Sequence, residues 1–116
     1  MSRSHVLLVE DDHHLREVTA DALRDSGIDV VEAANGVQAL AAMRGELPCL
    51  VLLDLMMPVM DGWEMARRMA ADPVLAQVPI CVVSAVASQA PPEASEVLSK
   101  PASLASLLAV VRKHRP

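Results

Sequence analysis

Aromatic side chains are nearly absent from this chain: its 116 residues include one tryptophan, Trp63, and neither tyrosine nor phenylalanine. Proteins that bind single-stranded nucleic acid stack the bases on aromatic rings, so this composition argues against that class. The formal net charge of −5 argues against it too, because a phosphate backbone attracts basic surfaces. No nucleic acid partner is therefore expected. Because Tyr and Phe are absent, the hydrophobic core must be aliphatic.

Long apolar runs and paired cysteines are also missing. No apolar stretch approaches the roughly 20 residues that a membrane-spanning helix needs, and the first residues, Met1 to His5, do not resemble a secretory signal. We therefore expect a cytoplasmic protein without a membrane partner. The two cysteines, Cys49 and Cys81, lie inside apolar runs and are expected to be small buried hydrophobes. The length indicates a single domain over residues 1–116.

The sequence instead alternates short apolar runs with longer amphipathic stretches. Three of the runs are apolar throughout, which is typical of strands covered on both faces, and the amphipathic stretches repeat at helical spacing. Alternating strands and helices predict an α/β fold with a parallel sheet and helices on both faces. The expected strands are 6–9, 28–31, 50–53, 78–83 and 96–98, and the expected helices are 12–26, 35–45, one from 61 onward and 101–114.

One connection is expected to be irregular. Residues 87–95 contain Pro91-Pro92, and proline inside a helix removes a hydrogen bond and clashes with the preceding turn. A short helical turn or a loop is therefore expected between the fourth and fifth strands, in place of a full helix.

Polar side chains follow the strands at one edge of the predicted sheet, where open parallel sheets bind their ligands. Carboxylates that converge there repel one another, by about 4 kcal/mol for unit charges about 4 Å apart at an effective dielectric of about 20. A Mg²⁺ ion, which binds carboxylate, water and phosphate oxygens, would offset this repulsion. The side chains are Glu10, Asp11, Asp12, Asp54, Ser84 and Lys100.

These residue types suit the transfer of a phosphoryl group to a carboxylate. Asp54 would be the nucleophile. Mg²⁺ and Lys100 would neutralise charge on the transferring group, and the Ser84 hydroxyl would bond one of its oxygens.

Four segments at these strand ends resemble the receiver domain of two-component response regulators, and the resemblance extends over nearly the whole chain. They are LVEDD at 8–12, LDLMMP at 53–58 followed by MDG at 60–62, VSA at 83–85, and LSKP at 98–101. The resemblance implies a flavodoxin-like, doubly wound sheet of five parallel strands in the order 2-1-3-4-5. The short stretch between Ser84 and Lys100 implies a shortened or irregular fourth helix.

The resemblance also implies a metal site. Asp11 and Asp54 would contact Mg²⁺ (or Mn²⁺) directly, Glu10 would act through water, and the backbone carbonyl of Met56 would be the third protein ligand. With the acidic pair assigned to Glu10 and Asp11, the next residue, Asp12, is expected to cap the following helix.

By the same resemblance, Asp54 would accept a phosphoryl group from the phosphohistidine of a histidine kinase or a histidine phosphotransfer protein. Ser84 and Lys100 would contact that group, and the Lys100–Pro101 peptide bond would be cis. Such a protein is not an enzyme beyond Mg-dependent self-phosphorylation from a phosphodonor and slow autodephosphorylation. It would signal through protein–protein contacts.

The chain departs from the family at Val97, where receivers usually carry the Tyr or Phe that reports phosphorylation. Output is therefore expected by phosphoryl relay or by rearrangement of residues 87–95. A stand-alone regulator is expected because no effector segment follows His114. A receiver cut from a longer hybrid kinase and a phosphorylation-independent interaction module stay open. A phosphatase of the haloacid dehalogenase type is disfavoured, because Asp54-Leu55-Met56 lacks its second aspartate.

Overall fold

The computed structural model describes residues 5–115, which form one five-stranded parallel sheet and four α-helices. Residues 1–4 and Pro116, which the predicted domain 1–116 includes, lie outside the described residues. In chain order the elements are β1 (Val6–Val9), α1 (His13–Asp25), β2 (Val30–Ala33), α2 (Gly36–Gly45), β3 (Leu50–Leu53), α3 (Gly62–Ala71), the 3-10 turn η1 (Leu75–Gln77), β4 (Ile80–Ser84), the 3-10 turn η2 (Ala87–Gln89), β5 (Glu96–Ser99) and α4 (Leu104–His114).

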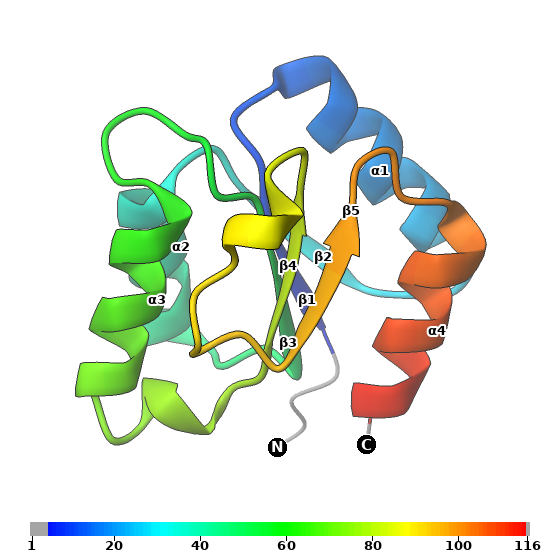
Figure 1. Cartoon of the computed structure of the whole chain (residues 1–116). Coiled ribbons are helices and arrows are strands. Elements are labelled where there is room, and N and C mark those ends of the chain that lie inside the picture. The colour runs from blue at the N-terminus through cyan, green and yellow to red at the C-terminus, as the bar shows by residue number, and fades with distance from the viewer. Residues whose placement is uncertain (1–4, 116) are drawn as a thin grey trace.

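The sheet is covered by helices on both faces, as predicted. Its strand order is β2-β1-β3-β4-β5, which confirms the order 2-1-3-4-5. Helices α2 and α3 lie on one face, and α1 and α4 lie on the other (Figure 1). Every residue of β1 and β3 is buried, in keeping with their uninterrupted apolar sequences. None of the helices in residues 5–115 is long and apolar enough to cross a membrane.

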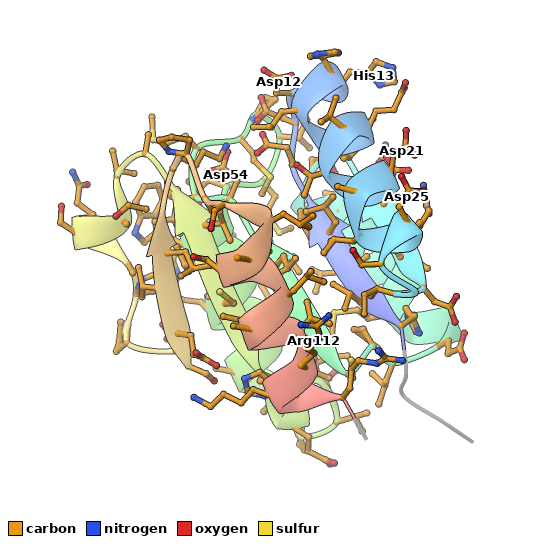
Figure 2. All side chains as sticks on the ribbon, turned by 90° about the vertical axis from the view of Figure 1, so that its right-hand side faces the viewer. Asp12, His13, Asp21, Asp25, Asp54 and Arg112 are labelled. Atoms are coloured by element: carbon orange, nitrogen blue, oxygen red, sulfur yellow. The ribbon has the colours of Figure 1, made fainter. Side chains whose placement is uncertain are left out.

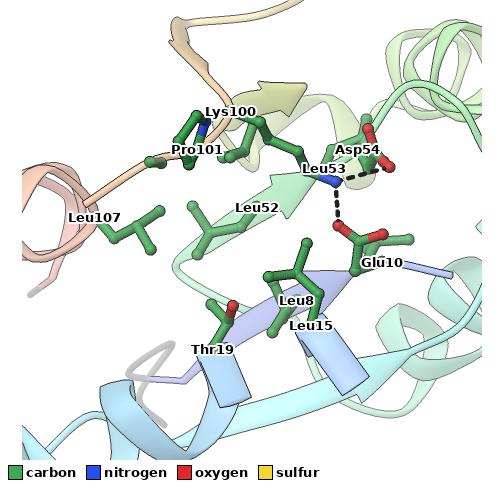
Figure 3. A pocket seen from close by; sticks show the side chains of 13 residues that line it. Leu8, Glu10, Leu15, Thr19, Leu52, Leu53, Asp54, Lys100, Pro101 and Leu107 are labelled. Atoms are coloured by element: carbon green, nitrogen blue, oxygen red, sulfur yellow. Dashed lines mark hydrogen bonds and ion pairs between the residues drawn. The ribbon is translucent and has the colours of Figure 1, made fainter. Parts of the chain in front are cut away.

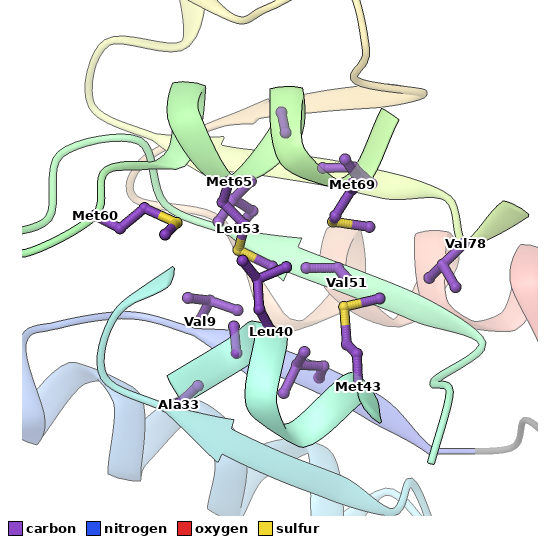
Figure 4. Close-up of a cluster of buried hydrophobic side chains, with 14 of the residues drawn as sticks. Val9, Ala33, Leu40, Met43, Val51, Leu53, Met60, Met65, Met69 and Val78 are labelled. Atoms are coloured by element: carbon purple, nitrogen blue, oxygen red, sulfur yellow. The ribbon is translucent and has the colours of Figure 1, made fainter. Parts of the chain in front are cut away.

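Two separate hydrophobic clusters fill the two sides of the sheet. The cluster under α2 and α3 is rich in methionine, whose flexible side chain fills irregular gaps in a core (Figure 4). The cluster on the α1 and α4 side contains both cysteines, Cys49 and Cys81, which are buried free thiols as predicted. The methionines of the first cluster are Met43, Met57, Met60, Met65 and Met69.

The second strand starts later than predicted, at Val30 and not at residue 28. Gly27 has a φ of 87°, and its N–H donates to the Arg24 carbonyl, while the N–H of Ile28 donates to the Leu23 carbonyl. This pair of bonds closes the C-terminal end of α1 in a Schellman motif. Ile28 is therefore used to end the helix, although its side chain is buried as the apolar pattern indicates.

Two other predicted boundaries shift for similar local reasons. The fourth strand begins at Ile80, because residues 75–77 form η1 and the N–H of Val78 bonds back to the Leu75 carbonyl. The last helix begins at Leu104, because the Ser103 side chain caps it by accepting from the N–H of Ser106. The irregular connection between β4 and β5 is confirmed: it contains only η2.

The loop before α3 contains a strained residue, Val59. Its φ is 70°, and the N–H of Met60 donates to the Pro58 carbonyl at 2.8 Å, which closes a tight three-residue turn. A β-branched residue in this region is disfavoured by about 1–3 kcal/mol. Because the Val59 side chain is 80% exposed, it returns little burial energy.

We expect Val59→Gly to raise the free energy of unfolding by about 1 kcal/mol, since glycine adopts a positive φ without strain. Urea denaturation would measure the change. The same substitution at Val37, an exposed position in α2, should instead lower stability, because glycine weakens a helix. Equal losses at both positions would show that the turn at Val59 is not strained.

The edge strand β5 is tied to α4 by an ionic cluster. The Nε2 atom of His114 lies 2.7 Å from Oε2 of Glu96, and the ammonium of Lys113 lies 3.5 Å from Oε1. The hydrogen bond to His114, followed by the charges of Lys113 and His114, lowers the pKa of Glu96. A carboxyl with a lowered pKa in the folded state stabilises the protein above its ordinary pKa.

This stabilisation should be lost as the pH falls below about 4, through the lowered pKa of Glu96. The loss should stay below about 1 kcal/mol, because the pair is near the surface. We expect Glu96→Gln to flatten the dependence of stability on pH between about pH 5 and pH 3. Urea curves across this range measure it, and identical pH slopes for the variant and the wild type would contradict the assignment.

Candidate functional site

The site lies where β1 and β3 end, side by side in the middle of the sheet. The N–H of Glu10 donates to the Ala33 carbonyl, and the N–H of Asp54 donates to the Val9 carbonyl, so both residues continue the backbone ladders of the sheet. Glu10 and Asp54 are 5% and 6% exposed. Two acidic residues are thus fixed by strand backbone at the carboxyl edge and are nearly removed from water.

Three of the predicted acidic residues come together. One carboxylate oxygen each from Glu10, Asp11 and Asp54 lies within 4.8 Å of the others. Asp11, unlike the other two, is exposed. Oxygen atoms of this kind and number, at one open edge, suit a hard divalent cation such as Mg²⁺.

Asp12 does not join this group. Its Oδ1 accepts from the N–H of Leu15 at 2.9 Å, so it caps α1 as predicted. The neighbouring His13 is exposed, with Nε2 lying 3.2 Å from a Glu17 carboxylate oxygen. Figure 2 shows Asp12 and His13 together at the start of α1.

Lys100, at the end of the edge strand β5, reaches across to the acidic residues. Its ammonium donates to Oε1 of Glu10 at 2.5 Å and to Oδ2 of Asp54 at 3.2 Å (Figure 3). Burial opposes the charged form of Lys100, yet the hydrogen bond and charge of Glu10 together with Asp54 outweigh it and raise its pKa. Lys100 is therefore a fixed positive charge, and its bond to Pro101 is cis.

Glu10 has a raised pKa. Burial is the main cause, and the negative charge of Asp54 adds to it, against the opposing hydrogen bonds from Lys100 and from the N–H of Asp12. Two buried carboxylates thus share one ammonium. The site carries an excess of negative charge that a divalent cation would balance.

An apolar cavity of about 300 Å³ lies beneath these ion pairs, next to α1 and α4. Glu10, Asp54 and Lys100 form its polar end, as Figure 3 shows. A lysine stem packs well along such an apolar surface while its ammonium stays with polar groups. The other labelled lining residues are Leu8, Leu15, Thr19, Leu52, Leu53, Pro101 and Leu107.

The remaining predicted residues lie on neighbouring segments. Ser84 ends β4, is fully buried, and accepts a hydrogen bond on its Oγ from the N–H of Val86 at 3.2 Å. Its carbonyl accepts from the N–H of Lys100, which joins the ends of β4 and β5. Met56 lies two residues beyond Asp54, with a side chain that is 59% exposed. Its metal-ligand role, like the phosphoryl contacts of Ser84, stays a prediction.

Sequence reasoning missed two residues that hold this backbone. The guanidinium of Arg16 donates to the Glu10 carbonyl at 2.8 Å and to the Glu32 carboxylate at 3.2 Å. Gly62 donates its N–H to the Leu55 carbonyl, and a Cβ on Gly62 would collide with the Asp54 carbonyl. The sequence contains one indication of the close approach at Gly62, because the smallest residue directly follows the helix-capping residue Asp61.

Known proteins match both the sequence and the structure. Residues 6–112 match the profile of the response regulator receiver domain. The DNA-binding response regulator MtrA of Mycobacterium tuberculosis is 42% identical over 83 residues, which are 72% of this chain and 35% of MtrA. The phosphate regulon regulator PhoB of Pseudomonas aeruginosa is 39% identical over 80 residues, 69% of this chain and 35% of PhoB. The chain thus spans about a third of the length of these relatives.

Two solved structures resemble the whole chain. The receiver domain of a Pseudomonas aeruginosa sensor histidine kinase, solved with magnesium in its active-site cleft, is 29% identical with a TM-score of 0.87, covering 96% of both chains. The response regulator TrrA of Thermotoga maritima, in complex with Mg²⁺-BeF, is 25% identical with a TM-score of 0.84, covering 95% of this chain and 97% of TrrA. The profile match and these likenesses agree with the acidic site at the sheet edge, and the chain belongs to the family of response regulator receiver domains.

Proposed function

We propose that this receiver accepts a phosphoryl group on Asp54 from a histidine kinase or a histidine phosphotransfer protein, with Mg²⁺ held by Glu10, Asp11, Asp54 and the Met56 carbonyl. The observation that carries the proposal is the Lys100 ammonium, which bonds to both Glu10 and Asp54 at the edge of a three-carboxylate cluster. A receiver domain is not a classical enzyme, because the group that would be phosphorylated is one of its own aspartates and not a separate substrate.

The arrangement of Asp54 suits attack on phosphorus. Its Oδ1 accepts from the N–H of Leu55 at 2.8 Å, and its Oδ2 accepts from Lys100, so the carboxylate is held in one orientation. When bound, Mg²⁺ would neutralise charge on the phosphoryl oxygens. An Asp54 oxygen would form the new P–O bond as the P–N bond to histidine breaks, and its electron pair would stay on the imidazole nitrogen.

Lys100 and Ser84 would serve the transferred group. The Lys100 ammonium is already placed beside Asp54, and transfer would bring phosphoryl oxygens within its reach as further acceptors. The Ser84 hydroxyl accepts from Val86 and keeps its own proton free to donate to a phosphoryl oxygen. The unit that we propose to act in this way is a single receiver domain over residues 1–116. Its output would pass through protein–protein contacts.

Incubation with Mg²⁺ and acetyl phosphate tests the proposal. We expect intact-mass spectrometry to show a gain of about 80 Da, the mass of one phosphoryl group, and peptide mapping to place it on Asp54. The gain should vanish in Asp54→Asn and on chelation of the metal. Asp72→Asn, which alters an exposed aspartate at the end of α3, should behave as the wild type. An equal gain in mass in Asp54→Asn would contradict the proposal.

A further inference from the structure

The one aromatic side chain of the protein is tied to the segment that follows β4. The indole Nε1–H of Trp63, on α3, donates to the main-chain carbonyl of Gln89 at 2.8 Å. Gln89 is the last residue of η2, the single helical turn that stands between β4 and β5. Trp63 therefore links α3 to the connection that is irregular in this chain.

Two more hydrogen bonds continue this link into the site. The N–H of Gln89 donates to the Val86 carbonyl at 2.8 Å, and the N–H of Val86 donates to the Ser84 hydroxyl oxygen at 3.2 Å. Ser84 is fully buried, so its hydroxyl has few alternative partners. Three consecutive bonds, through Gln89 and Val86, thus connect an indole N–H on α3 to the Ser84 hydroxyl.

We infer that Trp63 is a positioning residue for Ser84, and that a phosphoryl group on Asp54 changes the environment of the Trp63 indole through this series of bonds. The inference rests on the proposed function. With one lone pair accepting from the N–H of Val86, the Ser84 hydroxyl keeps its proton for another acceptor, and a phosphoryl oxygen at the site would supply one. Donation to that oxyanion would shift the Ser84 hydroxyl, and the hydrogen bonds that hold Val86 and Gln89 would pass this displacement to the indole.

The hydrogen bonds from Trp63 to Ser84 would replace a link that β5 does not provide. Val97, on β5, is a valine that is 44% exposed, so β5 offers no aromatic ring to follow the Ser84 hydroxyl. Trp63, Val86, Ala90 and Ala94 all pack against the methionine-rich cluster, so the connection is anchored on the α3 side of the sheet. The surface formed by α3 and η2 would therefore be the one that signals phosphorylation to a partner.

Thermodynamic linkage makes the coupling reciprocal. If the hydrogen bond of Trp63 to Gln89 strengthens ligand binding at Asp54, ligand binding must strengthen that hydrogen bond by the same free energy. The probe is beryllofluoride with Mg²⁺, a combination already seen bound to TrrA. Because the chain has a single tryptophan, its indole N–H gives one resonance that needs no assignment. We expect this resonance to shift when beryllofluoride and Mg²⁺ are both present, and not with either alone.

Two variants separate the series of bonds from mere closeness, since Trp63 and Met56 also line the same surface hollow. Ser84→Ala is compared at beryllofluoride and Mg²⁺ concentrations that ¹⁹F NMR shows to saturate the variant, which allows for weaker binding. The indole shift at saturation should fall to less than about a third of the wild-type shift. Gln89→Ala is the matched control: it removes the side chain but keeps both main-chain groups, so the indole shift should stay complete. A full-sized indole shift in Ser84→Ala would overturn the inference.

The affinity of the site supplies a second measurement. Trp63→Phe keeps a ring but loses the N–H donor, and we expect it to weaken beryllofluoride binding about 5- to 10-fold, the usual worth of one hydrogen bond or a modest coupling. Unchanged affinity contradicts the positioning role. If ¹⁹F NMR shows no Mg-dependent binding in the wild type, the proposed function itself fails. If binding occurs and the indole stays still, only this inference fails.

Discussion

Replacement of Gly62 by alanine is expected to lower the free energy of unfolding by about 3 kcal/mol, as severe overpacking does. A Cβ at this position would collide with the Asp54 carbonyl and lie 2.8 Å from the Cα of Leu55. Both are backbone atoms, fixed by β3 and by the hydrogen bond from Gly62 to Leu55 at 2.9 Å. No side-chain rotation can relieve the contact, so the start of α3 must move away from Asp54.

Urea denaturation measures the loss, and Gly45→Ala is its matched control. Gly45 ends α2, and a Cβ there would meet nothing within 4 Å. The same substitution should therefore leave stability unchanged or raise it by about 0.5–1 kcal/mol, because alanine favours the helix. A Gly62→Ala protein as stable as the Gly45→Ala protein would show that α3 and β3 are not in rigid contact.

Lys100→Met is expected to cost about 2–3 kcal/mol at neutral pH without divalent cations. Methionine keeps the apolar stem but removes the ammonium that bonds to Glu10 and Asp54, whose side chains are 7% and 8% exposed. Leaving buried carboxylates without their cation is costly. The pKa of Glu10, already raised by burial, should rise further, so the loss should shrink as acid protonates the site.

Mg²⁺ provides the sharper test of this prediction. A divalent cation would supply the positive charge that Lys100→Met removes, so Mg²⁺ should stabilise the variant more than the wild type in urea denaturation. Lys113→Met is the control, because its ammonium lies 3.5 Å from Glu96 near the surface, and its removal should change stability by less than about 0.5 kcal/mol. Greater stabilisation of the wild type by Mg²⁺ would contradict the assignment.

The sheet and the position of the acidic residues could be predicted because both follow from strong local patterns. The runs at β1 and β3 are apolar throughout, and Glu10 and Asp54 directly follow them, so strand ends in a parallel sheet place the two together. The boundary of β2 could not be predicted, because Ile28 is apolar and buried like a strand residue. Its hydrogen bond to Leu23 at the end of α1 decides the matter.

The supporting contacts of the site could not be predicted, because they depend on tertiary distances that no local pattern encodes. Arg16 looks like a surface residue of an amphipathic helix, yet its guanidinium holds the Glu10 carbonyl. Trp63 looks like one more apolar residue of α3, and its bond to Gln89 spans 26 residues. Pro91-Pro92 predicted that the connection between β4 and β5 is irregular. No sequence pattern predicted that Trp63 would bond to this connection.

The strand order has a consequence for how the protein assembles during synthesis. Each strand after the first pairs with a strand made earlier: β2 and β3 with β1, β4 with β3, and β5 with β4. The sheet can therefore grow in the order of translation without waiting for a distant segment. The acidic residues, by contrast, lie together from β3 onward, while the ammonium that balances them comes from a residue 90 positions after Glu10. A nascent chain thus carries this acidic cluster without its ammonium over the 46 positions from Asp54 to Lys100. The last strand therefore both completes the sheet and brings the Lys100 ammonium to its centre.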